Sequence, residues 1–338
     1  MVRGKGLGGM PMDCTNRQDV RLEALPHGFR VIIRSGQTCA EFVTDLPFSL
    51  PLLRALAEFH GQDAFSRIEN PLRYASLVEM LQRRHISLRG TSVLDVGCRY
   101  GTSSLAASRL GASLVVGVDI DLHCLDLARR IVHELDVHPG LRGGADLDFL
   151  LVSPNAQMPF AHSTFDIVLC NALFEHIAPA LRPALVRELW SLTRPGGYLI
   201  VHETPNRWWP RDGHTTGLWL VPLLPKSPVQ SLAGLFCRRF TRDQILDWDF
   251  MIAQGIRGVT YGEIAEHAPG HDLTLDLEAD DIKAYFDDML RFWHSPWNRV
   301  VNRAFRWTCR GLEWIICKPR KLPNTSVTPS LSMALRKT

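Results

Sequence analysis

One short stretch, residues 93–101, carries the residue types that point most clearly to chemistry. It reads Val-Leu-Asp-Val-Gly-Cys-Arg-Tyr-Gly, and the hydroxyl residues Thr102, Ser103 and Ser104 follow it. Strand-forming residues, two glycines and capping hydroxyls in this order predict a strand, a tight turn and a helix N-terminus. Glycine allows positive φ and lets a ligand lie against the backbone, while a helix N-terminus attracts negative charge. The stretch therefore predicts a site for a nucleotide-type cofactor.

Two acidic residues narrow the choice of cofactor. Asp119 ends a second apolar run about 20 residues past the glycine turn, where doubly wound nucleotide sites place the acid that accepts ribose hydroxyls. Asp95 stands two residues before the first glycine, where its carboxylate would repel a pyrophosphate and attract a cation. The turn also lacks the Gly-x-Gly-x-x-Gly spacing of NAD sites. The pattern supports an adenosyl cofactor and argues against NAD.

The motif Asp95-x-Gly97-x-Arg99-x-Gly101 resembles the acid-x-Gly-x-Gly-x-Gly signature of class I S-adenosylmethionine (SAM) dependent methyltransferases. Asp119 stands where that family has its second-strand acid. Further blocks resemble family motifs in the same order and spacing, namely residues 158–160, 164–169, 174–177 and 192–200. The resemblance covers residues 91–203. Residues 206–218 resemble a signature of a bacterial subgroup of these methyltransferases, type 11/23. A Rossmann-like domain without methyl transfer is the alternative.

The resemblance implies an α/β, Rossmann-like fold with a mostly parallel seven-stranded sheet and helices on both faces. An N-terminal helical cap and a C-terminal helical extension flank it, and residues 255–261 and 271–277 are expected to be the last two strands. We expect five segments: a disordered N-terminus (1–12), an accessory and helical cap (13–90), the SAM-binding domain (91–278), a helical extension (279–321) and a disordered tail (322–338).

The resemblance also implies SAM as the cofactor and a set of binding residues. Arg99 replaces the family's middle glycine, so its guanidinium either turns outward or pairs with the carboxylate of SAM. Asn155 replaces the usual third-strand acid and can still accept a hydrogen bond from adenine. The full predicted set is Asp95, Gly97, Arg99, Gly101, Asp119, Ile120, Asn155, Ala156 and Asn171.

An insertion at residues 202–235 is expected on the acceptor side, because ligands of open α/β sheets bind beyond the carboxyl ends of the strands. Its first part is long and rich in Trp, Arg, Asp and His, which argues for a functional loop. His214 is the best candidate for a catalytic base, with Asp212 to orient it, and His202 and His176 are further candidates. The alternatives are that His214 caps a helix near Thr215 and that His176 only shapes the site.

An oxygen acceptor fits these candidate bases. The sequence therefore predicts an enzyme that methylates a small-molecule, glycan or lipid-linked acceptor on oxygen. The alternatives are an RNA or protein methyltransferase and a SAM-binding protein without catalysis. The net charge of +3 and the mixed charges of the insertion argue against a nucleic-acid partner.

The cellular location of the protein is predicted from its cysteines and from the length of its apolar runs. Eight scattered cysteines without a Cys-x-x-Cys pair indicate a reducing compartment, hence the cytoplasm, with neither a zinc site nor a disulfide framework. No apolar run approaches the 18 or so residues of a membrane span. A basic stripe near the C-terminus either meets an anionic membrane surface or is the solvated face of a docked helix; it comprises Arg299, Arg303, Arg306 and Arg310.

Overall fold

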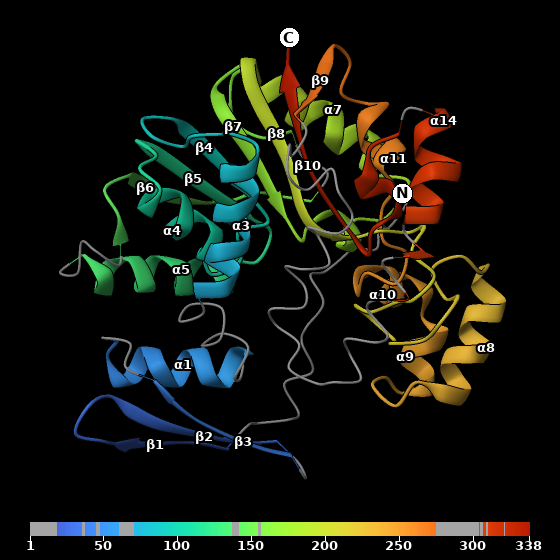
Figure 1. Ribbon diagram of the computed structural model, residues 1–338. Helices are drawn as coiled ribbons and strands as arrows, with labels where there is room; N and C mark the ends of the chain where they lie inside the picture. The colour runs from blue at the N-terminus through green and yellow to red at the C-terminus, as the bar shows by residue number, and fades with distance from the viewer. Residues whose placement is uncertain are drawn as a thin grey trace, which may run out of the picture. The chain divides into compact units, whose positions relative to one another are not determined.

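The computed structural model describes most of the chain, in two compact units (Figure 1). One unit comprises Met1–Ser76 and Cys98–Ala156, and the other comprises Leu77–Gly97 and Gln157–Thr338. The described residues are 19–35, 38–44, 48–60, 71–136, 142–154, 157–274, 304, 307–308, 310–320 and 322–338. The predicted disordered N-terminus and most of the predicted basic stripe lie outside them.

The first unit begins with a small antiparallel sheet backed by a helix. Strands β1 (Asp19–Ala24), β2 (Phe29–Ser35) and β3 (Thr38–Thr44) pair in that order, and helix α1 (Leu50–His60) packs beside them (Figure 1). Just before α1, the backbone N–H and the hydroxyl of Ser49 both donate to the carboxylate of Glu134, each at 2.6 Å. This anchors the N-terminal part on helix α5 of the same unit.

The rest of the first unit is a strand–helix–strand arrangement. After helix α4 (Thr102–Arg109) come β5 (Leu114–Asp119), α5 (Leu122–Leu135) and β6 (Asp146–Leu151). Strands β5 and β6 pair in parallel, with Asp119 opposite Leu151. The apolar face of α5 is fully buried, which is the burial that a parallel strand pair needs from its crossover helix.

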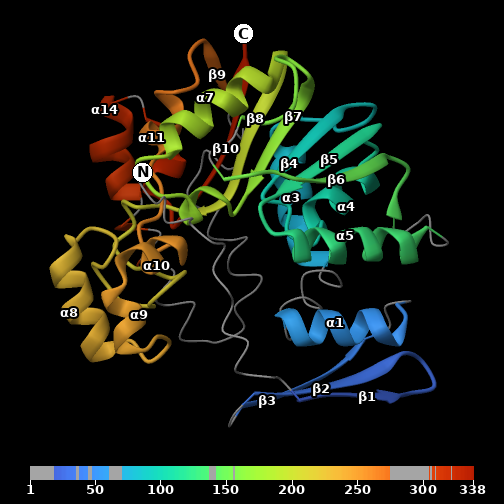
Figure 2. The ribbon, with the colours of Figure 1, turned by 180° about the vertical axis from the view of Figure 1, so that it is seen from behind.

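The second unit holds the other sheet strands. Helix α3 (Pro71–Arg83) leads into β4 (Ser92–Val96), which pairs in parallel with β7 (Phe165–Asn171); β7 in turn pairs in parallel with β8 (Thr193–Pro205). Helix α7 (Arg182–Leu192) covers one face of β7 and β8 (Figure 2). The strand order of the sheet is β6-β5-β4-β7-β8-β10-β9. A mostly parallel seven-stranded sheet with packed helices confirms the predicted fold class.

The last two strands differ from the prediction. Residues 255–261 form no strand, because Gly255 (φ 89°) and Gly258 (φ 52°) turn the chain and helix α11 (Tyr261–Ala265) begins at once. Strand β9 (His271–Thr274) lies within the second predicted strand, whose last residues lie outside the described part.

The final sheet strand, β10, comes from the segment that was expected to be disordered. It spans Ser330–Lys337 and runs antiparallel to β8 on one side and β9 on the other (Figure 1). The prediction of a disordered tail at 322–338 is therefore wrong. Its four apolar residues are all almost completely buried; they are Leu331, Met333, Ala334 and Leu335.

The segment between β8 and α11 contains three helices. Helices α8 (Lys226–Phe236), α9 (Arg242–Leu246) and α10 (Trp248–Ala253) gather around one apolar cluster (Figure 1). The remaining described elements are the turn η1 (Phe174–His176), the π-helical turn η2 (Glu313–Cys317), α14 (Lys318–Arg320) and η3 (Asn324–Val327). Among the described helices, none has the length and apolar character needed to cross a membrane.

Candidate functional site

The turn after β4 is built from residues with left-handed backbone. The φ angles are 72° at Gly97, 49° at Arg99 and 79° at Gly101. Arg99 thus adopts a conformation that costs a side-chain-bearing residue about 1–2 kcal/mol and that glycine adopts freely. A Cβ on Gly97 would lie 2.7 Å from the side chain of Leu173, and Gly101 is itself the N-cap of α4. No side chain caps α4 there, contrary to the sequence prediction.

Asp119 fastens this turn to the end of β5. Its Oδ2 accepts from the backbone N–H of Arg99 at 2.8 Å and its Oδ1 accepts from that of Asp121 at 3.0 Å. The side chain is buried, and burial raises the pKa of its carboxyl, whereas the backbone hydrogen bonds act in the opposite direction. The carboxylate, with about four lone-pair positions, keeps capacity to accept from a ligand hydroxyl.

Apolar side chains surround this carboxylate at the ends of β5 and β6. Ile120 is 61% exposed, Leu122 52% and Leu151 47%. Exposed apolar residues beside a buried acid suit a ligand with a polar sugar and a flat apolar ring. Asn155 and Ala156, predicted to contact the adenine, lie outside the described residues.

Two predicted cofactor residues lie on strands of the second unit. Asp95 is buried near the carboxyl end of β4, opposite Leu169 of β7. Burial and the negative charge of Asp95 both raise the pKa of the Cys170 thiol, and burial is the larger cause. Asn171 is the last residue of β7 and stands opposite His202 of β8. Both residues therefore mark carboxyl ends of parallel strands, where ligands bind in such sheets.

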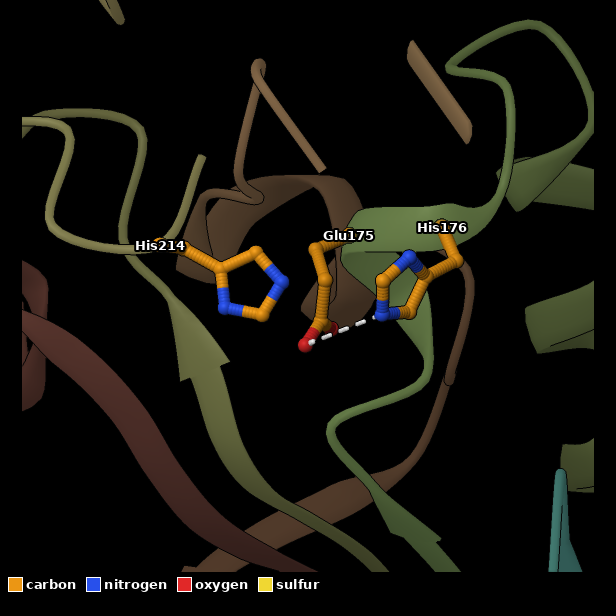
Figure 3. Close-up of side chains that lie close together, drawn as sticks. All are labelled: Glu175, His176 and His214. Atoms are coloured by element: carbon orange, nitrogen blue, oxygen red, sulfur yellow. Dashed lines mark ion pairs between the residues drawn. The ribbon is translucent and has the colours of Figure 1, made fainter. Parts of the chain in front are cut away.

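A second group of chemical side chains lies in the second unit just after β7. Glu175, His176 and His214 each place a potential ligand atom within 4.8 Å of those of the other two. Figure 3 shows the two imidazoles on either side of the Glu175 carboxylate. The Nε2 atom of His176 lies 3.9 Å from Oε1 of Glu175, and the two imidazole rings are 5.4 Å apart between centroids. We call these three residues the His–Glu cluster.

The surroundings of the His–Glu cluster hold it in place. Nδ1 of His176 lies 2.7 Å from the carbonyl oxygen of Ala253, which can only accept, so Nδ1 carries the proton and Nε2 has a lone pair. Gly255 leaves the space that the cluster needs, because a Cβ there would lie 2.8 Å from the ring of His214 and 3.3 Å from Glu175. Glu175 is completely buried, and this burial raises the pKa of its carboxyl to about 8.

The other two predicted catalytic residues have structural partners. The carboxylate of Asp212 accepts from the backbone N–H groups of His214, Thr215 and Thr216 and from the Thr216 hydroxyl, so it closes the loop. No helix begins at Thr215, so the alternative that His214 caps a helix there is wrong. His202 is buried, with its Nδ1 2.8 Å from the hydroxyl of Ser332 on β10. The sequence prediction missed Glu175 as a site residue, although it quoted the adjacent Glu-His pair.

Arg182 supports the backbone that carries the cluster. It is buried, donates through Nε to the carbonyl of Ile177 at 3.0 Å and pairs through Nη1 with Glu263 at 3.1 Å. Burial lowers the pKa of this guanidinium, and the Glu263 carboxylate opposes that effect. Ile177 directly follows His176, so the ion pair connects the cluster to helix α11.

We expect Arg182→Ala to lower the free energy of unfolding by about 3 kcal/mol, at the lower end of the range for breaking a buried ion pair. The lower end applies because Glu263 is partly exposed and keeps Arg207 at 3.5 Å as a second partner. Urea unfolding followed by circular dichroism measures the change. The exposed Arg187 on the same helix is the control, and Arg187→Ala should change stability by less than about 0.5 kcal/mol. Equal effects of the two substitutions would contradict the prediction.

Residues 94–201 match a family model described as a methyltransferase domain. Two similar curated proteins are both named ubiquinone biosynthesis O-methyltransferase. The one from Stutzerimonas stutzeri is 34% identical over 139 residues, which cover 41% of this chain and 52% of that protein. The one from Neisseria meningitidis serogroup C is 32% identical over 124 residues, covering 36% and 48%. The chain thus spans about half the length of these relatives. A solved SAM-dependent methyltransferase from Methanosarcina mazei is 27% identical, covers 36% of this chain and 56% of its own, and gives a TM-score of 0.32.

Proposed function

We propose that the chain is a class I SAM-dependent methyltransferase, which binds SAM and transfers its methyl group to a hydroxyl of a small-molecule acceptor; the match of residues 94–201 to a methyltransferase domain supports this. The observation that carries the proposal is the left-handed turn at Gly97, Arg99 and Gly101, tied by its backbone to the buried carboxylate of Asp119. The two glycines leave backbone open to a ligand, and the carboxylate of Asp119 can accept hydrogen bonds from ribose hydroxyls. The oxygen acceptor follows the names of the two O-methyltransferases.

On the cofactor side, each predicted residue has a distinct task. Asp119 accepts the ribose hydroxyls with its remaining lone pairs, and Ile120 packs against the adenine ring. Asp95 supplies negative charge for the cationic end of the cofactor, since SAM carries both an ammonium and a sulfonium group. Asn171 is the last residue of β7, the strand that pairs with β4, and is proposed as a further cofactor contact. Asn155 and Ala156 remain the proposed adenine contacts from the sequence.

On the acceptor side, the His–Glu cluster handles the proton of the hydroxyl. In the reaction, an oxygen lone pair forms the bond to the methyl carbon while the carbon–sulfur bond breaks, leaving a neutral thioether. The hydroxyl proton must leave, and neutral imidazoles are the side chains that manage this near pH 7. Two of them, His176 and His214, stand together here, whereas Asp212 and His202 are occupied with loop and strand contacts.

Calorimetry and a transfer assay test the proposal. The purified chain should bind SAM with a dissociation constant in the micromolar range, roughly −8 kcal/mol, and should bind NAD far more weakly. Methyl-labelled SAM offered with a panel of phenols, catechols, sugars and lipid-linked alcohols should label at least one acceptor on oxygen. Tight NAD binding without SAM binding would overturn the cofactor assignment. SAM binding with labelling of RNA or protein instead would overturn the acceptor class.

A further inference from the structure

We propose that Glu175, His176 and His214 bind a divalent transition-metal ion, most favourably Zn²⁺, and that this ion activates the acceptor hydroxyl. The first part stands on the cluster alone, and the second part rests on the proposed function. The cysteine pattern predicted no metal site, but these three ligands include no cysteine. They come from a turn after β7 and from a loop 38 residues later in the chain (Figure 3).

The donor set selects the kind of ion. Two imidazole nitrogens and one carboxylate oxygen suit Zn²⁺ and other late first-row metals, whereas Mg²⁺ and Ca²⁺ prefer oxygen ligands only. Three protein ligands are the number found in catalytic zinc sites, where a remaining position takes water or substrate. The ligand atoms now lie within 4.8 Å of one another and would approach to about 3–3.5 Å around an ion with bonds of about 2.1 Å.

Two features of the site favour an ion over a mere contact of side chains. Ligating histidines commonly donate their other N–H to a carbonyl, and Nδ1 of His176 does so to Ala253, which leaves Nε2 on the side of Glu175. Glu175 is completely buried, and one of its carboxylate oxygens lies within 4.8 Å of a ring nitrogen of each of the two histidines. Burying such a group is costly unless something pairs with it, and a cation would do so.

The ion would bind the acceptor hydroxyl and lower its pKa. A hydroxyl bound at the remaining position loses its proton to solvent, as metal-bound water does. The oxygen then forms its bond to the methyl carbon of SAM as the carbon–sulfur bond breaks, and S-adenosylhomocysteine leaves with its sulfur neutral. On this account His214 acts as a ligand of the ion and not as a free base.

Metal binding is tested directly on the full chain after chelation and dialysis. Titration with Co²⁺ should give visible absorption that saturates at one equivalent and that Zn²⁺ displaces. His214→Ala and His176→Ala should each weaken Zn²⁺ binding by more than about tenfold, the smallest loss that removing even a supporting group produces. His162→Ala is the matched control, because the exposed His162 precedes β7 at the opposite end of the strand. His214→Ala keeps the loop, since Asp212 bonds to backbone there; circular dichroism checks the fold of each variant.

The outcomes separate the metal site from the proposed function. No saturable Co²⁺ binding, or equal binding in folded His214→Ala, would overturn the site. Stoichiometric binding with full methyl transfer after complete chelation would overturn the ion's role in activating the acceptor. Chelation that abolishes transfer but leaves SAM affinity unchanged, with recovery on adding Zn²⁺, would support both parts. Metal binding with no transfer to any acceptor would leave the site standing and overturn the proposed function.

Discussion

A chain shortened by residues 330–338 is expected to lose its cooperative thermal transition. The deletion removes β10, which pairs along its length with β8 and at its end with β9. Without it, β8 becomes an open edge and β9 loses its partner strand, while the apolar residues that β10 buries disappear from the core. Circular dichroism and calorimetric melting of the full and shortened chains measure the effect. A cooperative transition within a few degrees of that of the full chain would contradict the placement of β10.

Two point substitutions in the same strand sharpen this test. Leu335 is completely buried, and Leu335→Ala should lower the free energy of unfolding by about 2–5 kcal/mol. Its neighbour Arg336 is exposed, so Arg336→Ala should stay within about 0.5 kcal/mol. Both substitutions leave the backbone of the strand in place, so the difference between them measures the effect of burying the Leu335 side chain. Equal effects at the two positions would contradict the burial of Leu335 and the exposure of Arg336.

The same strand illustrates where prediction from the sequence fails. Strands β4 and β5 are apolar runs that end at glycine or acidic residues, and β7 contains a continuous apolar run, so their local patterns predict them. β10 contains two serines, an arginine and a lysine among its eight residues, and its stability comes from β8, more than 120 residues earlier in the chain. The residues of β10 alone do not indicate that β8 pairs with them. The reverse error occurred at residues 255–261, where apolar alternation predicts a strand but two left-handed glycines bend the backbone.

The candidate site likewise has one part that the sequence predicted and one part that it did not. The turn residues and Asp119 are joined by contacts within about 20 residues, and their spacing predicted that arrangement. The His–Glu cluster depends on the path of the helical insertion, because Ala253 and Gly255 must return to His176 and His214. Sequence proximity suggested Asp212 as the partner of His214, and its carboxylate instead closes the loop. Glu175 became a candidate only when its burial beside two imidazoles was known.

Asp119 offers the largest expected effect on ligand binding. Two of its lone pairs accept the backbone N–H groups of Arg99 and Asp121, so the carboxylate is held in one orientation before any ligand arrives. A rigid, buried acceptor loses little entropy on binding a hydroxyl, and a hydrogen bond to a charged group contributes about 1.5–3 kcal/mol. If both ribose hydroxyls donate to Asp119, the two bonds together contribute about 3–6 kcal/mol to SAM affinity.

Asp119→Ala should therefore weaken SAM binding by roughly 100-fold or more, since 1.4 kcal/mol corresponds to a factor of ten. Asp126→Ala is the control, because Asp126 is an exposed acid on α5 that pairs only with Arg129 among the contacts described. Calorimetry with S-adenosylhomocysteine and its 2′-deoxy analogue assigns the loss to the ribose. Loss of the 2′-hydroxyl should weaken binding to the natural chain. It should not weaken binding to Asp119→Ala, because that variant already lacks the carboxylate that accepts from this hydroxyl. Equal losses in both folded proteins would place the ribose contact on another residue.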